Sequence, residues 1–204
     1  MRFHLIIWLF ILSSRLWSQA DSVAFSKDFV LYEGLYLSYT DLRHNWPIPK
    51  EKIITDIKKD QLEFYSKLIE NDKIEYIERD GEKTTIMAEK VWGFCQNNVV
   101  YLNSNKSFFR ITVFGSICFF VASVPVTYSA NYNTFINGPV GTTTTAKEIR
   151  DYLMDFYTGA RVDYNMENLE ILLKPDTEIY NEFKALSRKK KKELGPRFIR
   201  KYNE

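Results

Sequence analysis

The densest run of apolar residues lies in the middle of the chain, at Val91–Val121 (VWGFCQNNVVYLNSNKSFFRITVFGSICFFV). Within it, aromatic and β-branched residues form short runs that are separated by small polar residues and glycine. Short runs of this composition, bounded by turn residues, are typical of β-strands. The stretch therefore predicts the central antiparallel strands of one domain.

The first turn signal in this stretch is Asn97-Asn98. Asparagine tolerates the positive φ angles that a two-residue hairpin requires. Such a turn would place Cys95 opposite Val100 and Phe94 opposite Tyr101.

The second turn signal, Gly115-Ser116, has two interpretations. A tight turn would start a new strand and place Cys118 and Phe120 on the face of Ile111 and Val113. A glycine bulge within one long strand is the alternative.

Other segments repeat the strand pattern. Ile74–Met87 is predicted to be a β-hairpin, because two strand-like runs flank an Asp-Gly pair that suits a type I′ turn. Alternation of apolar and polar residues predicts further strands at Asp28–Tyr39, Glu148–Tyr157 and Ala160–Tyr164.

Helix signals gather at the C-terminus. Asn165 is a suitable N-cap for a helix at Met166–Leu173, and Pro175-Asp176 opens a second helix. We expect the second helix to run into Ser187–Glu193 and to be broken by Gly195-Pro196.

These elements together predict an α+β fold, mostly antiparallel β-sheet with C-terminal helices. The sheet is expected across Leu31–Tyr164, in a β-rich domain of residues 21–164. Residues 165–204 form a helical segment that packs on the same domain. Glu51–Asn71 has two predictions, because its apolar stripe suits a helix and its polar residues suit an extended segment.

Residues 111–146 contain no charged side chain, which raises the question of a membrane span. Ile111–Tyr128 reaches the lower length limit of a transmembrane helix, about 17–20 residues. Its many β-branched and aromatic residues favour a strand instead. Ser129–Thr145 is rich in Gly, Asn and Thr and is predicted to be a long polar loop, a place where function is common.

The first 20 residues have the pattern of a secretory signal peptide. Arg2 and His4 precede the apolar run Leu5–Leu12, and Ser18-Gln19-Ala20 offers small residues for cleavage. An uncleaved membrane anchor is the alternative. Cleavage would remove two cations from a chain of formal charge +2, leaving no net charge to attract nucleic acid. We therefore expect an exported protein in the periplasm, envelope or extracellular space.

The chain has two cysteines, Cys95 and Cys118. In an oxidising compartment such a pair readily forms a disulfide. The alternative is two buried free thiols that act as small apolar residues. A bridge needs Cα atoms within roughly 7 Å, which depends on strand register.

Few residues suit ordinary catalytic chemistry. His44 is the one histidine left after cleavage, and no Gly-x-Ser-x-Gly turn accompanies it. Gly141–Lys147 lacks the second glycine and the final hydroxyl residue of a phosphate-binding loop. No metal cluster or cofactor is expected. Carboxylates are plentiful, but no pair stands out, and Asp151 and Asp155 are expected to face solvent.

Two groups of side chains are candidates for binding. Aromatic residues suit a sugar or peptide platform, and the best placed are Trp46, Tyr128 and Tyr132, while Trp92 and Tyr101 are expected to pack in the sheet. Cations near the C-terminus suit an anionic lipid, surface polysaccharide or acidic partner, or else complement the helix dipole in solvent. They are Lys189, Lys190, Lys191, Lys192, Arg197 and Arg200.

Several motifs together resemble a family of uncharacterised exported proteins of Bacteroidota. They are EGLYLSYTDL, VWGFC followed by GSICFF, DFYTG followed by NLEILLKPDTEIYNEFK, and the terminal FIRKYNE. The resemblance implies an exported or envelope location and no particular activity. We therefore expect a non-enzymatic interaction or structural module that meets an envelope component. A secreted hydrolase with a carboxylate pair is the alternative.

Overall fold

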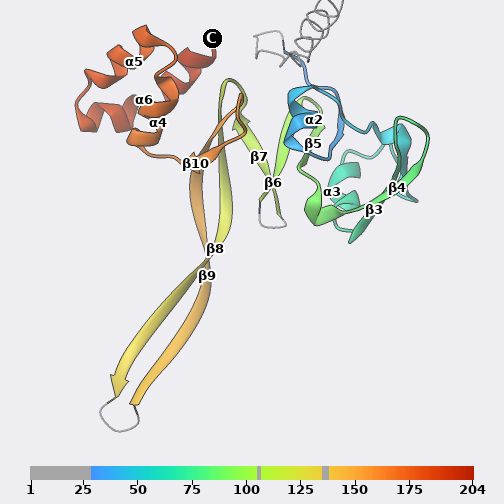
Figure 1. Cartoon of the computed structure of the whole chain (residues 1–204), viewed down its shortest axis with the longest axis horizontal. Coiled ribbons are helices and arrows are strands. Elements are labelled where there is room, and N and C mark those ends of the chain that lie inside the picture. The colour runs from blue at the N-terminus through green and yellow to red at the C-terminus, as the bar shows by residue number, and fades with distance from the viewer. Residues whose placement is uncertain (1–28, 105–106, 135–137) are drawn as a thin grey trace, which may run out of the picture.

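The computed structural model describes residues 29–104, 107–134 and 138–204, with the backbone alone described at 129–134 and 138–142. The predicted signal peptide lies outside these residues. A seven-stranded antiparallel sheet has the order β1-β5-β6-β7-β8-β9-β10 (Figure 1). Its strands are β1 (Gly34–Tyr36), β5 (Gly93–Gln96), β6 (Val99–Ser104), β7 (Ser107–Val113), β8 (Ile117–Thr134), β9 (Gly138–Asp155) and β10 (Arg161–Asp163). Together with the C-terminal helices, this sheet confirms the predicted α+β fold.

A second sheet of three strands stands beside the first. It contains β2 (Ile53–Ile54), β3 (Lys73–Ile77) and β4 (Lys83–Met87), in that order. The β3–β4 pair is the hairpin predicted at Ile74–Met87. The ambiguous segment before it holds the short helix α3 (Phe64–Leu68), whose Phe64, Tyr65 and Leu68 are buried. Single 3₁₀ turns, η2 (Lys50–Lys52) and η3 (Ala88–Lys90), join these pieces to the larger sheet.

The central turn predictions are confirmed. Phe94 pairs with Tyr101 and Cys95 with Val100, and Asn97 and Asn98 have φ of 51° and 59°. The second signal, Gly115-Ser116, is a turn between β7 and β8, so the chain reverses there.

The faces after that turn are only partly as predicted. Ile111 pairs with Phe120, and both lie in the cluster that contains Cys118. The register shifts between Ile111 and Val113, which is the irregularity of a β-bulge. Val113 therefore packs against the helices instead of sharing the face of Ile111.

Two predictions about strand extent are wrong. The strand expected at Asp28–Tyr39 is limited to Gly34–Tyr36, because Ser38 caps the helix α2 (Tyr39–Arg43) through a reciprocal pair of bonds with Asp41. The predicted loop Ser129–Thr145 is strand at Ser129–Thr134 and Gly138–Thr145, where β8 and β9 pair in unbroken register. Threonine is a good strand former, but the sequence of this segment does not alternate apolar and polar residues, so its composition resembles that of a loop.

Three helices close the C-terminus: α4 (Met166–Leu173), α5 (Thr177–Lys184) and α6 (Arg188–Asn203). Asn165 and Asp176 cap the first two, as predicted. The expected continuation of α5 into Ser187–Glu193 is wrong, because Ser187 caps a separate helix.

The predicted break at Gly195-Pro196 is also wrong, since α6 passes through it. Phe198 and Ile199 anchor the following turn in the core. Pro196 lies on the exposed side of the helix, where water can satisfy the carbonyl that loses its donor.

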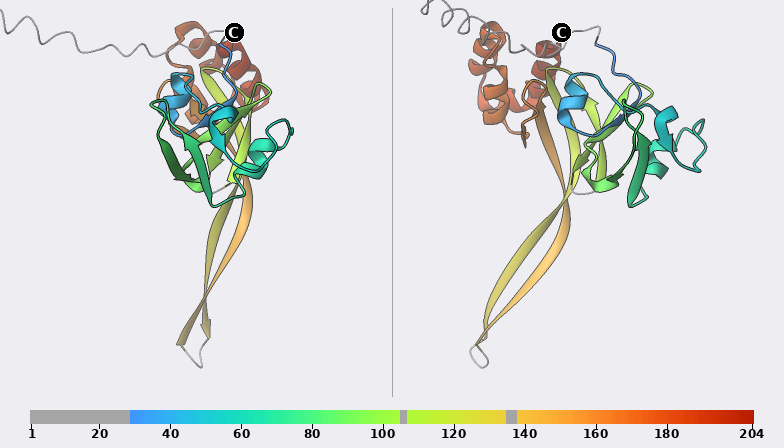
Figure 2. Two further views of the ribbon diagram at one scale, coloured as in Figure 1. Left: turned by 90° about the vertical axis from the view of Figure 1, so that its right-hand side faces the viewer. Right: turned by 45° about the vertical axis from the view of Figure 1, so that its right-hand side comes forward.

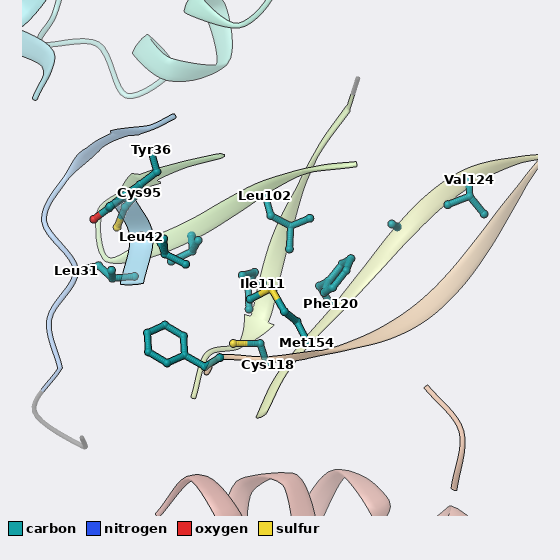
Figure 3. Close-up of a cluster of buried hydrophobic side chains, with 13 residues drawn as sticks. Leu31, Tyr36, Leu42, Cys95, Leu102, Ile111, Cys118, Phe120, Val124 and Met154 are labelled. Atoms are coloured by element: carbon teal, nitrogen blue, oxygen red, sulfur yellow. The ribbon is translucent and has the colours of Figure 1, made fainter. Parts of the chain in front are cut away.

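The core consists of three clusters. Leu102, Ile111, Phe120 and Met154 belong to the first, which lies under the large sheet (Figure 3). The second joins the two sheets around Phe94 and Tyr65, and the third joins the helices to β8 and β9. Among the residues described, none of the helices has the length and apolar character that a membrane crossing needs.

Candidate functional site

The most distinctive feature of the molecule is a long two-stranded projection from the sheet (Figures 1 and 2). We call its outer part, Thr127–Thr134 of β8 and Gly138–Thr145 of β9, the β-arm. Eight residue pairs belong to it, which at about 3.4 Å per residue give a reach of roughly 27 Å. Ala122 and Val124 are buried against the body, whereas Thr127, Tyr128 and Thr143–Thr145 are exposed. The arm therefore leaves the body where its buried residues end.

Neighbouring strands stop well short of the β-arm. β7 pairs with β8 no further out than Phe120, and β10 pairs with β9 no further out than Tyr152. Beyond these points, no strand in the described part of the chain covers either outer edge. Both strands of the arm therefore present backbone N–H and C=O groups to solvent, as an edge strand does.

The two prolines show which residues direct their backbone groups outward. In an antiparallel ladder, pairs alternate between those bonded to each other and those whose groups point away. Proline has no N–H and fits the second kind. Pro125 pairs with Lys147, and Pro139 pairs with Asn133. These two pairs are an even number of positions apart on the ladder, so both prolines can occupy outward positions.

Hydrogen bonds at the base of the hairpin support this phase. The N–H of Asp155 points away from β8 and donates to Ala160 O at 3.0 Å, and Asp151 O points away and accepts from Tyr164 N at 2.8 Å. Odd-numbered residues therefore direct their backbone groups outward. In the β-arm these are Thr127, Ser129, Asn131 and Asn133 on β8 and Gly141, Thr143 and Thr145 on β9.

The β-arm has little of the usual protection of an exposed edge, with Pro139 as its one proline. Natural sheets cover their edges with charged residues, prolines or bulges, because bare edges pair with other chains. Charges are present at the base, in Lys147, Glu148 and Arg150, but residues 127–145 contain none. Between Pro139 and Lys147, the outer edge of β9 carries outward donors without interruption. This segment and Thr127–Asn133 of β8 are the two candidates for adding a strand from another molecule.

The predicted loop aromatics lie on this hairpin. Tyr128 is in β8, pairs with Thr144 and is 49% exposed. Tyr132 pairs with Val140 further out, among the residues of which the backbone alone is described. Trp46 lies elsewhere, on the body beside His44 and Arg79. The three predicted binding aromatics therefore do not form one site.

The basic residues of α6 divide into two groups. Lys191 is half-buried, with its Nζ 2.7 Å from Glu170 Oε2 and 5.3 Å from the ring centre of Phe183. Lys201 is paired with Glu182. The other exposed cations are Arg188, Lys189, Lys190, Lys192, Arg197 and Arg200.

Helical geometry places most of the exposed cations on one face. Lys190 and Arg197 are seven residues apart, and Lys189 and Arg200 are eleven apart, so each pair shares a side of α6. This basic face, with Glu193 inside it, lies opposite the buried Phe198. It stands at the end of the molecule away from the tip of the β-arm (Figure 2).

Both cysteines are buried free thiols. β6 and β7 separate their strands, which at ~4.8 Å per strand gives roughly 14 Å along the sheet, beyond the reach of a bridge. Figure 3 shows Cys95 by Tyr36 and Cys118 by Met154. Burial raises the pKa of the Cys95 thiol to about 11 and that of Cys118 to about 12. The structure thus has two buried free thiols, which is the alternative to a disulfide.

Acidic residues near the sheet have local structural partners. Asp155 Oδ1 accepts hydrogen bonds from the backbone N–H groups of Tyr157 and Thr158, which stabilises the turn into β10. Asp151 is exposed beside Asp163 in a shallow depression. Within the described ranges, no three or more His, Cys, Asp or Glu side chains gather as a metal ion would require.

No family model, curated protein or solved structure matches the chain. The geometry of its own residues is therefore the basis for a functional conclusion. The strongest feature is the β-arm, whose two outer edges have no neighbouring strand in the described part of the chain. The sequence pattern predicts a loop there. One signal in the sequence indicates a hairpin. Pro125 and Pro139 are an even number of residues apart, so both can occupy outward positions of one ladder, and the segment that contains them is uncharged and rich in threonine.

Proposed function

We propose that this protein is an exported, non-enzymatic module of the cell envelope that holds a partner by strand addition to its β-arm. One observation carries the proposal: the outer edge of β9 offers outward donors from Gly141 to Thr145 without a charge or a proline. A two-stranded ribbon is marginally stable alone in water, and a third strand would satisfy its unpaired groups. The predicted signal peptide supports the location.

The basic face of α6 supports a second contact in the same arrangement. Lys189, Lys190, Arg197 and Arg200 belong to α6, which lies at the end of the molecule opposite the arm tip (Figure 2). An anionic surface at that end would leave the β-arm directed away from it. The hydrolase alternative has less support, because the three carboxylates that share a hollow of the body, Asp41, Glu78 and Asp80, each accept a hydrogen bond from a neighbouring residue of their own segment.

The test replaces Thr143 with proline in the full chain. Thr143 directs its N–H outward, so Thr143→Pro removes one edge donor and keeps the hairpin, just as Pro125 and Pro139 do. Thr143→Val is the matched control, because it changes the side chain and keeps the donor. In pull-downs from solubilised envelope of the organism that encodes the chain, we expect the native protein and Thr143→Val to capture the same partner.

Thr143→Pro should capture at least about tenfold less of that partner than the native protein does, because it loses one hydrogen bond at the edge and its ring blocks the incoming strand. Ser129→Pro makes the same change on the edge of β8 and should retain the partner. Equal capture by the native protein and both proline variants would contradict strand addition.

A further inference from the structure

A second candidate site is a hollow of about 300 Å³ on the body, remote from the β-arm. It lies where the two sheets meet, between the end of β1, the loop after α2 and the β3–β4 turn. Leu37, Ile48 and Tyr76 provide apolar surface, and the polar wall is Asp41, Glu78, Arg79 and Asp80. Ligand pockets usually measure about 300–1,000 Å³, so this hollow is at the lower end of that range, and its lining is half charged instead of mainly apolar.

Trp46 stands at this hollow with 51% of its surface exposed. An exposed indole contributes little to the core, yet its backbone is held rigidly. Asn45 beside it has φ of 53° and accepts hydrogen bonds at its Oδ1 from Tyr36 OH at 2.9 Å and Tyr32 N at 2.8 Å. Its Nδ2 donates to Val30 O at 2.8 Å. These bonds therefore hold the backbone beside Trp46 in place before any ligand arrives.

The other side of Trp46 is supported by close packing. The backbone of Ile48 pairs with Leu35 at 2.8 and 2.9 Å, which holds the two residues after the tryptophan. Gly34 has φ of 155°, and a Cβ there would come within 2.6 Å of Pro47 Cβ and Ile48 O. Glycine is required at this point, because the loop that presents Trp46 lies directly against the strand.

Two side chains already stack on the indole. The His44 ring centre is 4.7 Å from it at 23°, and the Arg79 guanidinium carbon is 4.7 Å from its centre. Arg79 comes from the β3–β4 turn, so Trp46 links the two sheets at the mouth of the hollow. The accessible half of the ring offers an apolar surface beside hydrogen-bonding groups of both kinds.

The polar groups select the chemistry of a ligand. Asp41, Glu78 and Asp80 accept hydrogen bonds, whereas Arg79 donates them. Three carboxylates against one guanidinium disfavour an anion. A cation would compete with Arg79 for the indole. A neutral polyol suits the site best, because each hydroxyl both donates and accepts and the C–H groups of a sugar can pack against the exposed part of the indole.

We propose that this hollow binds one or two sugar units of a neutral glycan, packed against the exposed part of Trp46 and hydrogen-bonded by Glu78 and Arg79. The site goes beyond strand addition and does not depend on it, since it shares no residue with the β-arm. The two contacts would join a glycan and a protein partner on one molecule.

Calorimetric titration of the full chain with maltotetraose, cellotetraose, mannotetraose and chitotetraose tests the site. We expect one of these sugars to bind at micromolar to millimolar concentration. Trp46→Ala and Arg79→Gln should each weaken it by about tenfold or more, while Trp46→Phe should retain part of the affinity. Tyr128→Ala is the matched control, because it removes an equally exposed aromatic residue from the hairpin and should leave sugar binding unchanged.

Three outcomes would overturn the proposal. They are no binding by any of the four sugars at millimolar concentration, equal affinity in the native protein and a folded Trp46→Ala variant, and preferential binding of a tetralysine peptide. Circular dichroism of each variant establishes that it is folded. Partner capture by Trp46→Ala should match that of the native protein. A negative result for the glycan site therefore does not contradict strand addition, and a negative result for strand addition does not contradict the glycan site.

Discussion

At the scale of single residues, burial determines the chemistry of the two cysteines. Cys118 is enclosed, and its Sγ donates to Gly115 O at 3.2 Å. Cys95 is covered by the aromatic residues around Tyr36. A thiol reacts as its thiolate, and burial disfavours that charge, so both side chains act as small apolar residues of the core.

Stability should therefore fall in alkaline solution. The folded pKa of both thiols lies above the ordinary value of 9.0, so their contribution is complete below pH 9 and is lost as the pH rises through 9 toward 11–12. Between pH 8 and about pH 10 we expect the free energy of unfolding to fall by on the order of 2 kcal/mol for the pair. Urea titrations of the native protein and of Cys95→Ala/Cys118→Ala would measure it, and an equally steep fall in the double variant would contradict this cause.

A single asparagine joins the end of the chain to the sheet. Asn203 Oδ1 accepts from Ile117 N and its Nδ2 donates to Ile117 O, both at 2.9 Å. A Cβ on Gly115 would come within 2.2 Å of Asn203 Cγ, so glycine leaves the space that this side chain occupies. The turn before β8 and the last turn of α6 therefore depend on each other.

Asn203→Ala should lower the free energy of unfolding by about 1–3 kcal/mol, because it leaves two backbone groups of Ile117 without partners. Asn181→Ala, an exposed asparagine in α5, is the matched control and should change stability by less than about 0.5 kcal/mol. Chemical denaturation measures both. Similar values for the two variants would show that the contact contributes nothing specific.

At the scale of elements, the β-arm is a ladder with two chemically different kinds of backbone position. Thr144 directs its N–H toward Tyr128 within the hairpin, while its neighbours Thr143 and Thr145 direct theirs to solvent. Side-chain chemistry is nearly the same at all three threonines, so the phase of the ladder alone distinguishes them.

Amide hydrogen exchange should report that phase. We expect Thr143 and Thr145 to exchange faster than Thr144, by about tenfold or more if the hairpin persists without a partner. Two-dimensional NMR of labelled protein resolves the three amides. Equal exchange would mean that the outer hairpin opens as a unit, and adding the captured partner should then slow Thr143 and Thr145 selectively.

At the scale of the whole molecule, the basic face of α6 and the tip of the β-arm stand at opposite ends (Figure 2). Lys191 is already used inside the structure, because its salt bridge with Glu170 is largely buried. The exposed cations around it are free of such packing. This separation suggests that one end meets an anionic surface and the other meets a protein.

Replacing Lys189, Lys190, Arg197 and Arg200 by glutamine should abolish binding to vesicles that contain phosphatidylglycerol, while phosphatidylcholine vesicles bind neither protein. The attraction is electrostatic, so salt should weaken it. The control makes the same change of charge at Lys58, Lys73, Lys83 and Lys90 of the body, all exposed. Co-sedimentation measures binding, and equal loss in the control would assign the effect to net charge instead of to this face.

Local interactions made part of this structure predictable. The caps at Asn165 and Asp176, the turn at Asn97-Asn98 and the β3–β4 hairpin depend on residues within a few positions of each other. Their side chains and φ angles act on the adjacent backbone, so a sequence pattern is enough to find them.

The candidate sites were predictable only in part. Trp46 and Tyr128 stood out as aromatic residues in polar segments, but Arg79 and Glu78 did not, because they reach Trp46 from a turn more than 30 residues away. Asn45–Lys50 contains the tryptophan without any sign of which side chains would surround it. Distant groups meet through packing, which single-sequence patterns do not report.

The sequence by itself determined the strand-rich centre, the capped C-terminal helices and the scarcity of catalytic side chains, because each follows from local residue chemistry. Tertiary structure decided that α6 passes through Pro196, that three strand spacings separate the cysteines, and that the threonine-rich segment pairs as strands. Each of these depends on free energy from contacts between residues far apart in the chain, and such contacts can outweigh local preference.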